Sequence, residues 1–244
     1  MSFAARLRHA LELRQIDVIA ELRAGDSLEN ILNKHLKTVE RLSNEEILTS
    51  VLLLSPDGKR LTHGAAPSLP QPYVEAIDGS EIGPVAGSCG TAAYLGQPVY
   101  VSDIATDPLW AAYRDLALPH GLRSCWSTPI RHADGGVMGT FAIYHHSVGG
   151  PTKEELRSID IITDNVARAI TWARDPHAIM YAFDMLPRLA ALEAITGAIA
   201  EQASTADSEV QEAVEAVVMG SKKLADLIRQ RLPQTSEEAD ALPE

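Results

Sequence analysis

The sequence is poor in cysteine and lacks any continuous apolar run long enough to cross a membrane. Two cysteines in 244 residues do not make the disulfide framework that is typical of small secreted domains. No apolar run reaches the roughly 18 residues of a membrane-spanning helix, and the N-terminus MSFAARLRHALELRQ has no apolar signal core. We therefore expect a cytoplasmic protein with reduced thiols.

Positive charge is also scarce. The chain has 21 Lys and Arg against 33 Asp and Glu, a net charge of −12. Such a charge opposes nonspecific contact with nucleic acid or with an anionic membrane. The segment 178–232 repeats the imbalance, with five basic and eight acidic residues, so it is a poor phosphate binder. We expect neither nucleic acid nor a membrane as a partner, and we interpret this segment as a dimer or partner surface.

Motifs of an enzymatic output are missing as well. The sequence contains no Walker loop, no phosphoacceptor histidine of the kinase type, and no cyclase or phosphodiesterase signature. No His/Cys spacing resembles a zinc site. These absences favour a protein that is not an enzyme.

Helical patterns occupy both ends of the chain. Apolar residues at helical spacing predict helices over 3–22 and 28–42, and Asp26 or Ser27 is placed to cap the second one. The first helix has two interpretations, packing on its own domain or pairing with its counterpart in a second subunit. Toward the C-terminus we expect helices over 179–202 and 206–231, forming a helical hairpin or a dimer seam, before a disordered acidic tail at 233–244.

The central part alternates between strand-like runs and turns. Apolar runs predict strands over 47–54, 60–64, 98–101, 123–130 and 137–144. Asp134-Gly135 between the last two runs predicts a hairpin. Helices are expected over 72–77, over 107–118 after an N-cap at Asp107, and over 152–172, where Thr152 and Glu155 form a capping box. The glycine-rich stretch 83–96 is interpreted as a connection.

At these residues the chain resembles a known family. GSCGTAA, PVYVSDI with DPLW, LRSCWSTPI and GVMGTFAIY follow one another as in the second half of a GAF domain, and the match covers about 43–172. The resemblance implies an α+β fold with a central antiparallel sheet of about six strands, helices on its faces and a small-molecule pocket on one side. It divides the chain into N-terminal helices (1–42), a sensor domain (43–175), a C-terminal helical extension (178–232) and the tail (233–244).

The family binds diverse ligands, so the site has to be argued from its residues. We expect a ligand held noncovalently, with hydroxyls and aromatic walls around it and the helix start at Asp107 offering free backbone N–H groups. The candidate residues are Cys89, Thr91, Tyr94, Asp103, Asp107, Trp110, Tyr113, Cys125, Trp126, Ser127 and Thr140. Strand alternation puts Cys125 and Ser127 on one face and Trp126 on the other, and either face could line the pocket.

Three alternatives use the same region. Free methionine-(R)-sulfoxide reductase, an enzyme of the GAF type, has a cysteine in a glycine setting similar to that of Cys89, but the loop 104–115 here lacks its reactive cysteine. Covalent bilin is disfavoured because 111–114 holds no cysteine. Haem would need an axial histidine such as His120. The leading hypothesis is a stand-alone homodimeric sensor that passes its ligand state to the flanking helices or to a signalling partner.

Overall fold

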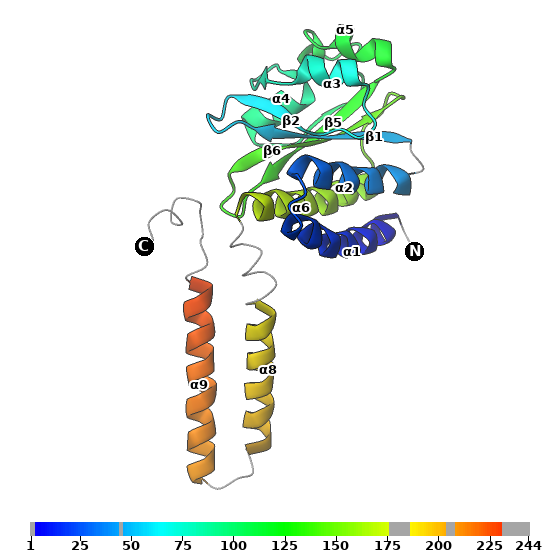
Figure 1. Ribbon diagram of the computed structural model, residues 1–244. Coiled ribbons are helices and arrows are strands. Elements are labelled where there is room, and N and C mark those ends of the chain that lie inside the picture. Colours follow the sequence, from blue (N-terminus) through cyan, green and yellow to red (C-terminus); the bar gives the residue numbers. More distant parts are fainter. Residues whose placement is uncertain (1–2, 44–45, 176–185, 204–207, 231–244) are drawn as a thin grey trace. The chain divides into compact units, whose positions relative to one another are not determined.

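The computed structural model describes residues 3–43, 46–175, 186–203 and 208–230. The chain forms two compact units, Met1–Ala173 and Arg174–Glu244. The first unit contains one antiparallel sheet with helices on both faces, and the second contains a pair of helices (Figure 1). In the described residues no helix combines the length and the apolar character that crossing a membrane requires.

Six strands form the sheet, in the order β3-β2-β1-β6-β5-β4. Their bounds are Ile47–Leu54 (β1), Arg60–Ala65 (β2), Ser80–Glu81 (β3), Val99–Val101 (β4), Ser124–Arg131 (β5) and Val137–His145 (β6). All neighbouring strands are antiparallel. The predicted fold class, a central antiparallel sheet of about six strands with helices on its faces and a helical part toward the C-terminus, is thereby confirmed.

The centre of the sheet depends on one tight turn and one close approach. β5 and β6 are joined by the predicted hairpin, in which Gly135 has a φ of +92° and Asp134 Oδ1 accepts a hydrogen bond from Gly136 N at 2.8 Å. Gly139 faces β1 across the sheet, where a Cβ atom would clash with the carbonyl oxygen of Leu52. Glycine at this position allows β1 and β6 to pair without distortion.

Helices cover the two faces unequally (Figure 1). α1 (Phe3–Arg23), α2 (Leu28–Leu42) and α6 (Lys153–Arg174) lie on one side, whereas α3 (Gln71–Ile77), α4 (Gly87–Leu95) and α5 (Arg114–Ala117) lie on the other. Two short 3₁₀ helices, η1 (Pro108–Trp110) and η2 (Leu118–His120), flank α5. The predicted caps are present: Ser27 Oγ accepts from Asn30 N at 3.2 Å, and Thr152 and Glu155 form the capping box with bonds of 2.6 and 3.3 Å.

A buried carboxylate joins α2 to the sheet. Glu40, only 1% exposed, accepts hydrogen bonds at Oε1 from the backbone N–H of Thr49 at 2.9 Å and from its hydroxyl at 3.0 Å. Ser68 Oγ donates to the other carboxylate oxygen at 2.6 Å. A buried charge is tolerated when its oxygens are satisfied in this way, so Glu40 fixes α2 against β1.

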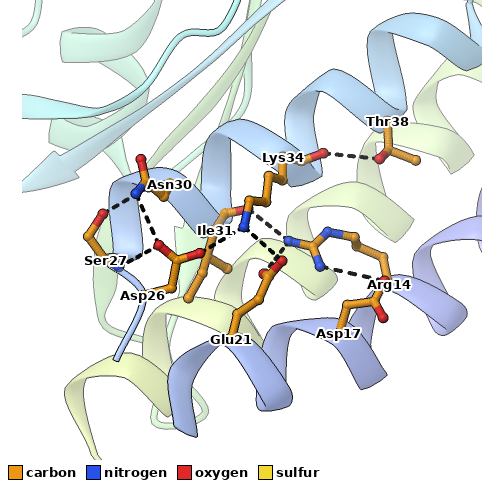
Figure 2. Close-up of polar contacts among 9 residues, drawn as sticks. All are labelled: Arg14, Asp17, Glu21, Asp26, Ser27, Asn30, Ile31, Lys34 and Thr38. Carbon is orange, nitrogen blue, oxygen red and sulfur yellow. Dashed lines mark hydrogen bonds and ion pairs between the residues drawn. The ribbon is translucent and has the colours of Figure 1, made fainter. Parts of the chain in front are cut away.

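The first helix packs on its own unit, one of the two interpretations left open by the sequence. Leu7, Leu11 and Val18 are buried. Arg14 is 8% exposed and donates to Glu21 at 2.5 Å and to the carbonyl oxygen of Ile31 on α2 at 3.5 Å (Figure 2). These contacts tie α1 to α2.

Lys34 extends this polar junction toward the loop between the helices. Its ammonium group lies 3.0 Å from Glu21 and 2.7 Å from Asp26 (Figure 2). Half of the Lys34 side chain is exposed, in contrast to the buried Arg14. Solvent therefore screens the Lys34 pairs more strongly than the Arg14–Glu21 pair.

His35 on α2 is fully buried, and neither ring nitrogen has a hydrogen-bond partner in the described part of the chain. Burial, together with the positive charges of Arg14 and Arg168, lowers the pKa of His35 from 6.5 to about 4. The imidazole is therefore neutral at physiological pH and acts as a core side chain.

The second unit consists of α8 (Leu186–Ala203) and α9 (Ser208–Gln230), which pack against each other. Ser221 Oγ donates to Thr196 Oγ1 at 3.4 Å where the two side chains are buried between the helices. Apolar side chains on the outside remain partly exposed, at Leu192, Ile195, Ile199, Val210, Val217 and Met219. The predicted acidic tail at 233–244 lies outside the described residues.

Two segments differ from the sequence-based expectations. The stretch 83–96, expected as a connection, contains the helix α4, and the helix expected over 107–118 is divided into η1, α5 and η2. Seven of the nine residues of α4 are buried, so its sequence has no polar face and lacks helical periodicity. Gly96 ends α4 in the left-handed conformation that favours glycine.

Replacing Arg14 should test the junction between α1 and α2. We expect Arg14→Ala to lower the free energy of unfolding by about 2 kcal/mol, because Glu21 loses its buried partner and the arginine stem leaves the interface. Lys34→Ala is the matched control, since it removes an exposed partner of the same carboxylate, and should cost much less because solvent screens that pair. Urea unfolding of the three proteins measures both values, and equal losses would contradict a special role of Arg14.

His35 should make the stability of the fold fall in mild acid. Between pH 6.5 and about 4 the unfolded chain binds a proton that folded His35 does not, so stability is lost as the pH decreases through this window. The loss should reach about 2 kcal/mol near pH 5 relative to pH 7. His35→Leu should remove that part of the pH dependence in urea unfolding, and an unchanged slope would show that other groups cause it.

Candidate functional site

A small cavity lies between the sheet and the helices of the α3–α4–α5 side. Its volume is about 30 Å³, enough for one or two water-sized molecules. Strands β1, β2 and β6, helices α3 and α4 and the segment around η1 all contribute to its wall. The lining residues are Leu52, Leu61, Tyr73, Ile77, Ser80, Ala86, Gly87, Ser88, Cys89, Gly90, Trp110, Tyr113 and Tyr144.

The strand register answers which face of β5 looks toward this site. Cys125 pairs with Tyr144, a lining residue, whereas Trp126 pairs with Ile143. Cys125 and Ser127 therefore lie on the face of β5 that points toward the cavity. Trp126 lies on the opposite face, where its indole donates to the carbonyl oxygen of Gly149 at 2.9 Å and its ring packs on His145.

Two hydrogen bonds in series connect the roof of the cavity, formed by Trp110 and Tyr113, to its floor on β5 and β6. Trp110 Nε1 donates to Ser88 Oγ, and Ser88 Oγ donates to the carbonyl oxygen of Cys125, each at 3.0 Å. Tyr113 packs edge-on against Trp110, with ring centroids 6.5 Å apart. Gly87 passes directly below both rings with a φ of +62°, a conformation that other residues rarely adopt.

The two cysteines lie side by side at the floor. The neighbouring Cys125 thiol lowers the pKa of Cys89 to about 7, against the opposing effect of burial. The hydroxyls of Ser127, Thr140 and Tyr144 act in the same direction as Cys125. Burial raises the pKa of Cys125 well above its ordinary value, as does the neighbouring Cys89.

Two tyrosines complete the polar floor. Tyr144 Oη lies 4.0 Å from Cys89 Sγ, and the rings of Tyr73 and Tyr144 meet edge-on at 5.8 Å. Burial raises the pKa of both phenols well above the ordinary value, so both remain protonated donors. Neither tyrosine was among the sequence-based candidates. Alternation from Thr140 places Tyr144 on its face, whereas no sequence signal marked Tyr73.

The remaining candidates lie elsewhere around the site. Thr91 Oγ1 accepts from Ala86 N at 3.0 Å and so fixes the start of α4, while Tyr94 is 55% exposed. Asp103 accepts from Ala105 N at 3.1 Å, and Asp107 caps η1 by accepting from Leu109 N at 2.9 Å. These two carboxylates stabilise the segment that carries the roof and do not line the cavity.

Of the predicted residues, Cys89, Trp110 and Tyr113 line the cavity itself. Ser127 and Thr140 are completely buried beside Cys89, and in the described part of the chain their hydroxyls have no hydrogen-bond partner of normal geometry. Ser88, which links the roof to the floor, was missed by the sequence reasoning because 83–96 was interpreted as a loop.

The residues present do not fit a haem or a bound metal at this site. A cavity of about 30 Å³ has no room for a porphyrin, and no histidine is among its lining residues. His120 packs edge-on against Tyr73 with ring centroids 6.3 Å apart. In residues 3–43, 46–175, 186–203 and 208–230, no group of three or more His, Cys, Asp or Glu side chains is arranged to hold a metal ion.

Comparison with known proteins identifies the family. The sequence profile described as GAF domain matches residues 25–171. The chain belongs to the GAF domain family. A curated relative, the "Methyl sulfide methyltransferase-associated sensor" of Methanosarcina acetivorans, is 37% identical over 149 residues, 61% of this chain and 15% of that protein. This chain thus spans only a small part of the length of its curated relative.

Solved structures share the fold at lower identity. A putative GAF sensor protein from Burkholderia vietnamiensis is 20% identical with a TM-score of 0.55, and the match covers 72% of this chain and all of that one. Free methionine-R-sulfoxide reductase from Neisseria meningitidis, solved with its substrate, is 16% identical with a TM-score of 0.54, covering 71% and 93%. At these identities the likeness shows the GAF fold, and any activity has to be inferred from the residues of the site.

The hydrogen-bonded link at Ser88 can be tested by its effect on stability. We expect Ser88→Ala to lower the free energy of unfolding by about 2 kcal/mol, because it leaves the buried Trp110 indole without its partner and removes the hydroxyl bond to the Cys125 carbonyl. Thr140→Val is the matched control, since that hydroxyl is buried without a normal partner and its removal should be neutral or stabilising. Urea unfolding measures both, and a harmless Ser88→Ala would contradict the link.

Proposed function

We propose that this GAF domain is a noncatalytic sensor that binds a small molecule under the roof formed by Trp110 and Tyr113. The observation that carries the proposal is the series of hydrogen bonds from Trp110 through Ser88 to Cys125. This series of hydrogen bonds connects the segment of short helices that carries Trp110 to the strand β5 of the sheet. A ligand with a hydrogen-bond acceptor could replace Ser88 as the partner of the indole and so favour an open roof.

The segment that would move is well defined. Between β4 and β5 the chain runs through η1, α5 and η2, none longer than four residues. Local turn and capping hydrogen bonds hold this segment instead of strand pairing, and long connections of this kind often form binding lids. In the closed arrangement the cavity of about 30 Å³ excludes an organic ligand, so binding would require this segment to swing outward.

The same site supplies a route for the signal. β5 and β6 carry the floor of the cavity on one face, and on the other face Phe141 and Ile143 are buried on the side of α2 and α6. A ligand that shifts α4 against β5 would favour one packing of these helices over another, which is a coupling free energy between two sites. We propose that the flanking helices pass this change to a second copy of the chain or to a signalling partner in the cytoplasm.

Exposed apolar residues support a homodimer. On α8, Leu192, Ile195 and Ile199 recur at three- and four-residue steps and are 37%, 57% and 43% exposed. This spacing produces one stripe along a helix, the pattern by which two helical pairs associate. The exposed Leu13 and Ile16 on α1 are a second apolar surface of the same kind.

Native mass spectrometry of protein purified from its source cells tests the proposal. We expect an adduct of a small organic molecule on the wild type, and its loss on Trp110→Phe, which keeps the ring but lacks the indole donor. Trp126→Phe is the matched control, because its indole bonds to Gly149 on the other face and its loss should leave the adduct unchanged. Light scattering on the same samples should report a dimer.

Two outcomes would overturn this function. If wild-type protein carries no adduct, and the low-molecular-weight fraction of a source-cell extract leaves its tryptophan fluorescence unchanged, the site is not a ligand site. If Trp110→Phe and Trp126→Phe reduce the adduct equally, the ligand does not lie under the roof. Turnover of free methionine sulfoxide in a coupled assay, abolished by Cys89→Ser, would instead favour a thiol-dependent reductase.

A further inference from the structure

Two thiols are in contact at the floor of the cavity. Cys89 on α4 and Cys125 on β5 lie near enough for each thiol to shift the pKa of the other, and both belong to the same buried core cluster. Ser88, the neighbour of Cys89, donates to the backbone carbonyl of Cys125 at 3.0 Å, so the start of α4 is already fixed over this point of β5. A disulfide bond of about 2.05 Å would join α4 to β5 at this point.

Only one of the two thiols is accessible from the cavity. Cys89 is among the lining residues and 9% exposed, whereas Cys125 is completely buried and does not line the cavity. The volume of about 30 Å³ admits a molecule the size of one or two waters. Hydrogen peroxide has this size and the required polarity, whereas an aryl or alkyl hydroperoxide with a bulky group does not fit.

We propose that Cys89 and Cys125 form a reversible disulfide in response to hydrogen peroxide, with Cys89 as the attacking thiol and Cys125 as the resolving thiol. This reaction does not rest on the proposed ligand binding, since it needs only the closed cavity. Oxidation would be a second signal, besides the ligand, that acts on the same elements. The disulfide would fix α4 to β5 at the point where the hydrogen bonds from Trp110 through Ser88 end.

The reaction balances in two steps. In the first, the Cys89 thiolate attacks one peroxide oxygen, an S–O bond forms, the O–O bond breaks, and the leaving hydroxide takes up the thiol proton to become water. In the second, the Cys125 sulfur attacks the sulfenic sulfur of Cys89, the S–S bond forms, the S–O bond breaks, and the hydroxide leaves as water with the Cys125 proton. Two thiols are oxidised, and one peroxide is reduced to two water molecules.

The electrostatics of the pair assign the two roles in the same order. The neighbouring Cys125 thiol lowers the pKa of Cys89 to about 7, which favours its reactive thiolate form. Burial holds the pKa of Cys125 high, and the neighbouring Cys89 adds to this effect. Once Cys89 becomes an uncharged sulfenic acid, its charge no longer opposes ionisation of Cys125, which favours the second step.

The test treats reduced, folded full-length protein with hydrogen peroxide and follows the intact mass. We expect the wild type to lose the mass of two hydrogen atoms, to show a Cys89–Cys125 peptide cross-link within one chain, and to recover both thiols with dithiothreitol. Cys125→Ser should stop at one added oxygen on Cys89, trapped by dimedone. Cys89→Ser should lose the reaction, and cumene hydroperoxide should oxidise the wild type far more slowly than hydrogen peroxide.

The controls make each result decisive. Urea-unfolded wild type shows the peroxide concentration at which unprotected thiols react, and near-ultraviolet circular dichroism shows that both serine variants are folded. If Cys89→Ser fails to fold, the position of the dimedone label on Cys125→Ser still identifies the attacking thiol. Three outcomes would each overturn the proposal. The native thiols could resist peroxide at concentrations at which the unfolded thiols react, the first oxidation could fall on Cys125, or the disulfide could form only between chains. None of these outcomes bears on the adduct experiment with Trp110→Phe, so the two proposals can fail separately.

Discussion

The packing of α4 onto β5 and β6 is the constraint on which the rest of the site depends. One hydrogen bond, from Ser88 to the Cys125 carbonyl, fixes the start of this helix over the sheet. The same serine then accepts the Trp110 indole, so the roof, the helix and the floor share one side chain. A buried hydroxyl that both donates and accepts is costly to lose, because two hydrogen bonds break at once and the Trp110 indole loses its partner.

Small side chains on α4 make this close packing possible. From Gly87 to Ala93 the helix carries glycine, serine, cysteine, threonine and alanine, and all seven positions are buried. A Cβ on Gly90 would come within 2.7 Å of the Ala86 side chain and 3.3 Å of the carbonyl oxygen of Glu81. The loss of helix propensity at such residues is offset by burial against the sheet. The cavity remains where these small groups meet the large rings of Tyr73, Tyr144 and Trp110.

The strands other than the two-residue β3 and the amphipathic helices were predictable from the sequence, and α4 was not. The bounds of β1 and of α2 coincide with the predicted 47–54 and 28–42, because each has a sharp boundary signal: the Pro56-Asp57-Gly58 turn for the strand and the Ser27 cap for the helix. α4 is buried on almost all sides, so no periodicity distinguishes it from a glycine-rich loop. Because the stretch was interpreted as a connection, nothing in the sequence singled out Ser88.

The candidate site was predictable to the extent that it follows from strand alternation. Period two placed Cys125 and Ser127 together and separated them from Trp126, but alternation alone cannot tell which face of a sheet buried on both sides meets α4. Only the register with Tyr144 decides this. The contact of Cys89 with Cys125 joins positions 36 residues apart, and such a contact requires the helix and the strand to be placed in space. The solved GAF sensor structure at 20% identity shares the fold, so the chemistry of the site has to be argued from the side chains where α4 meets β5.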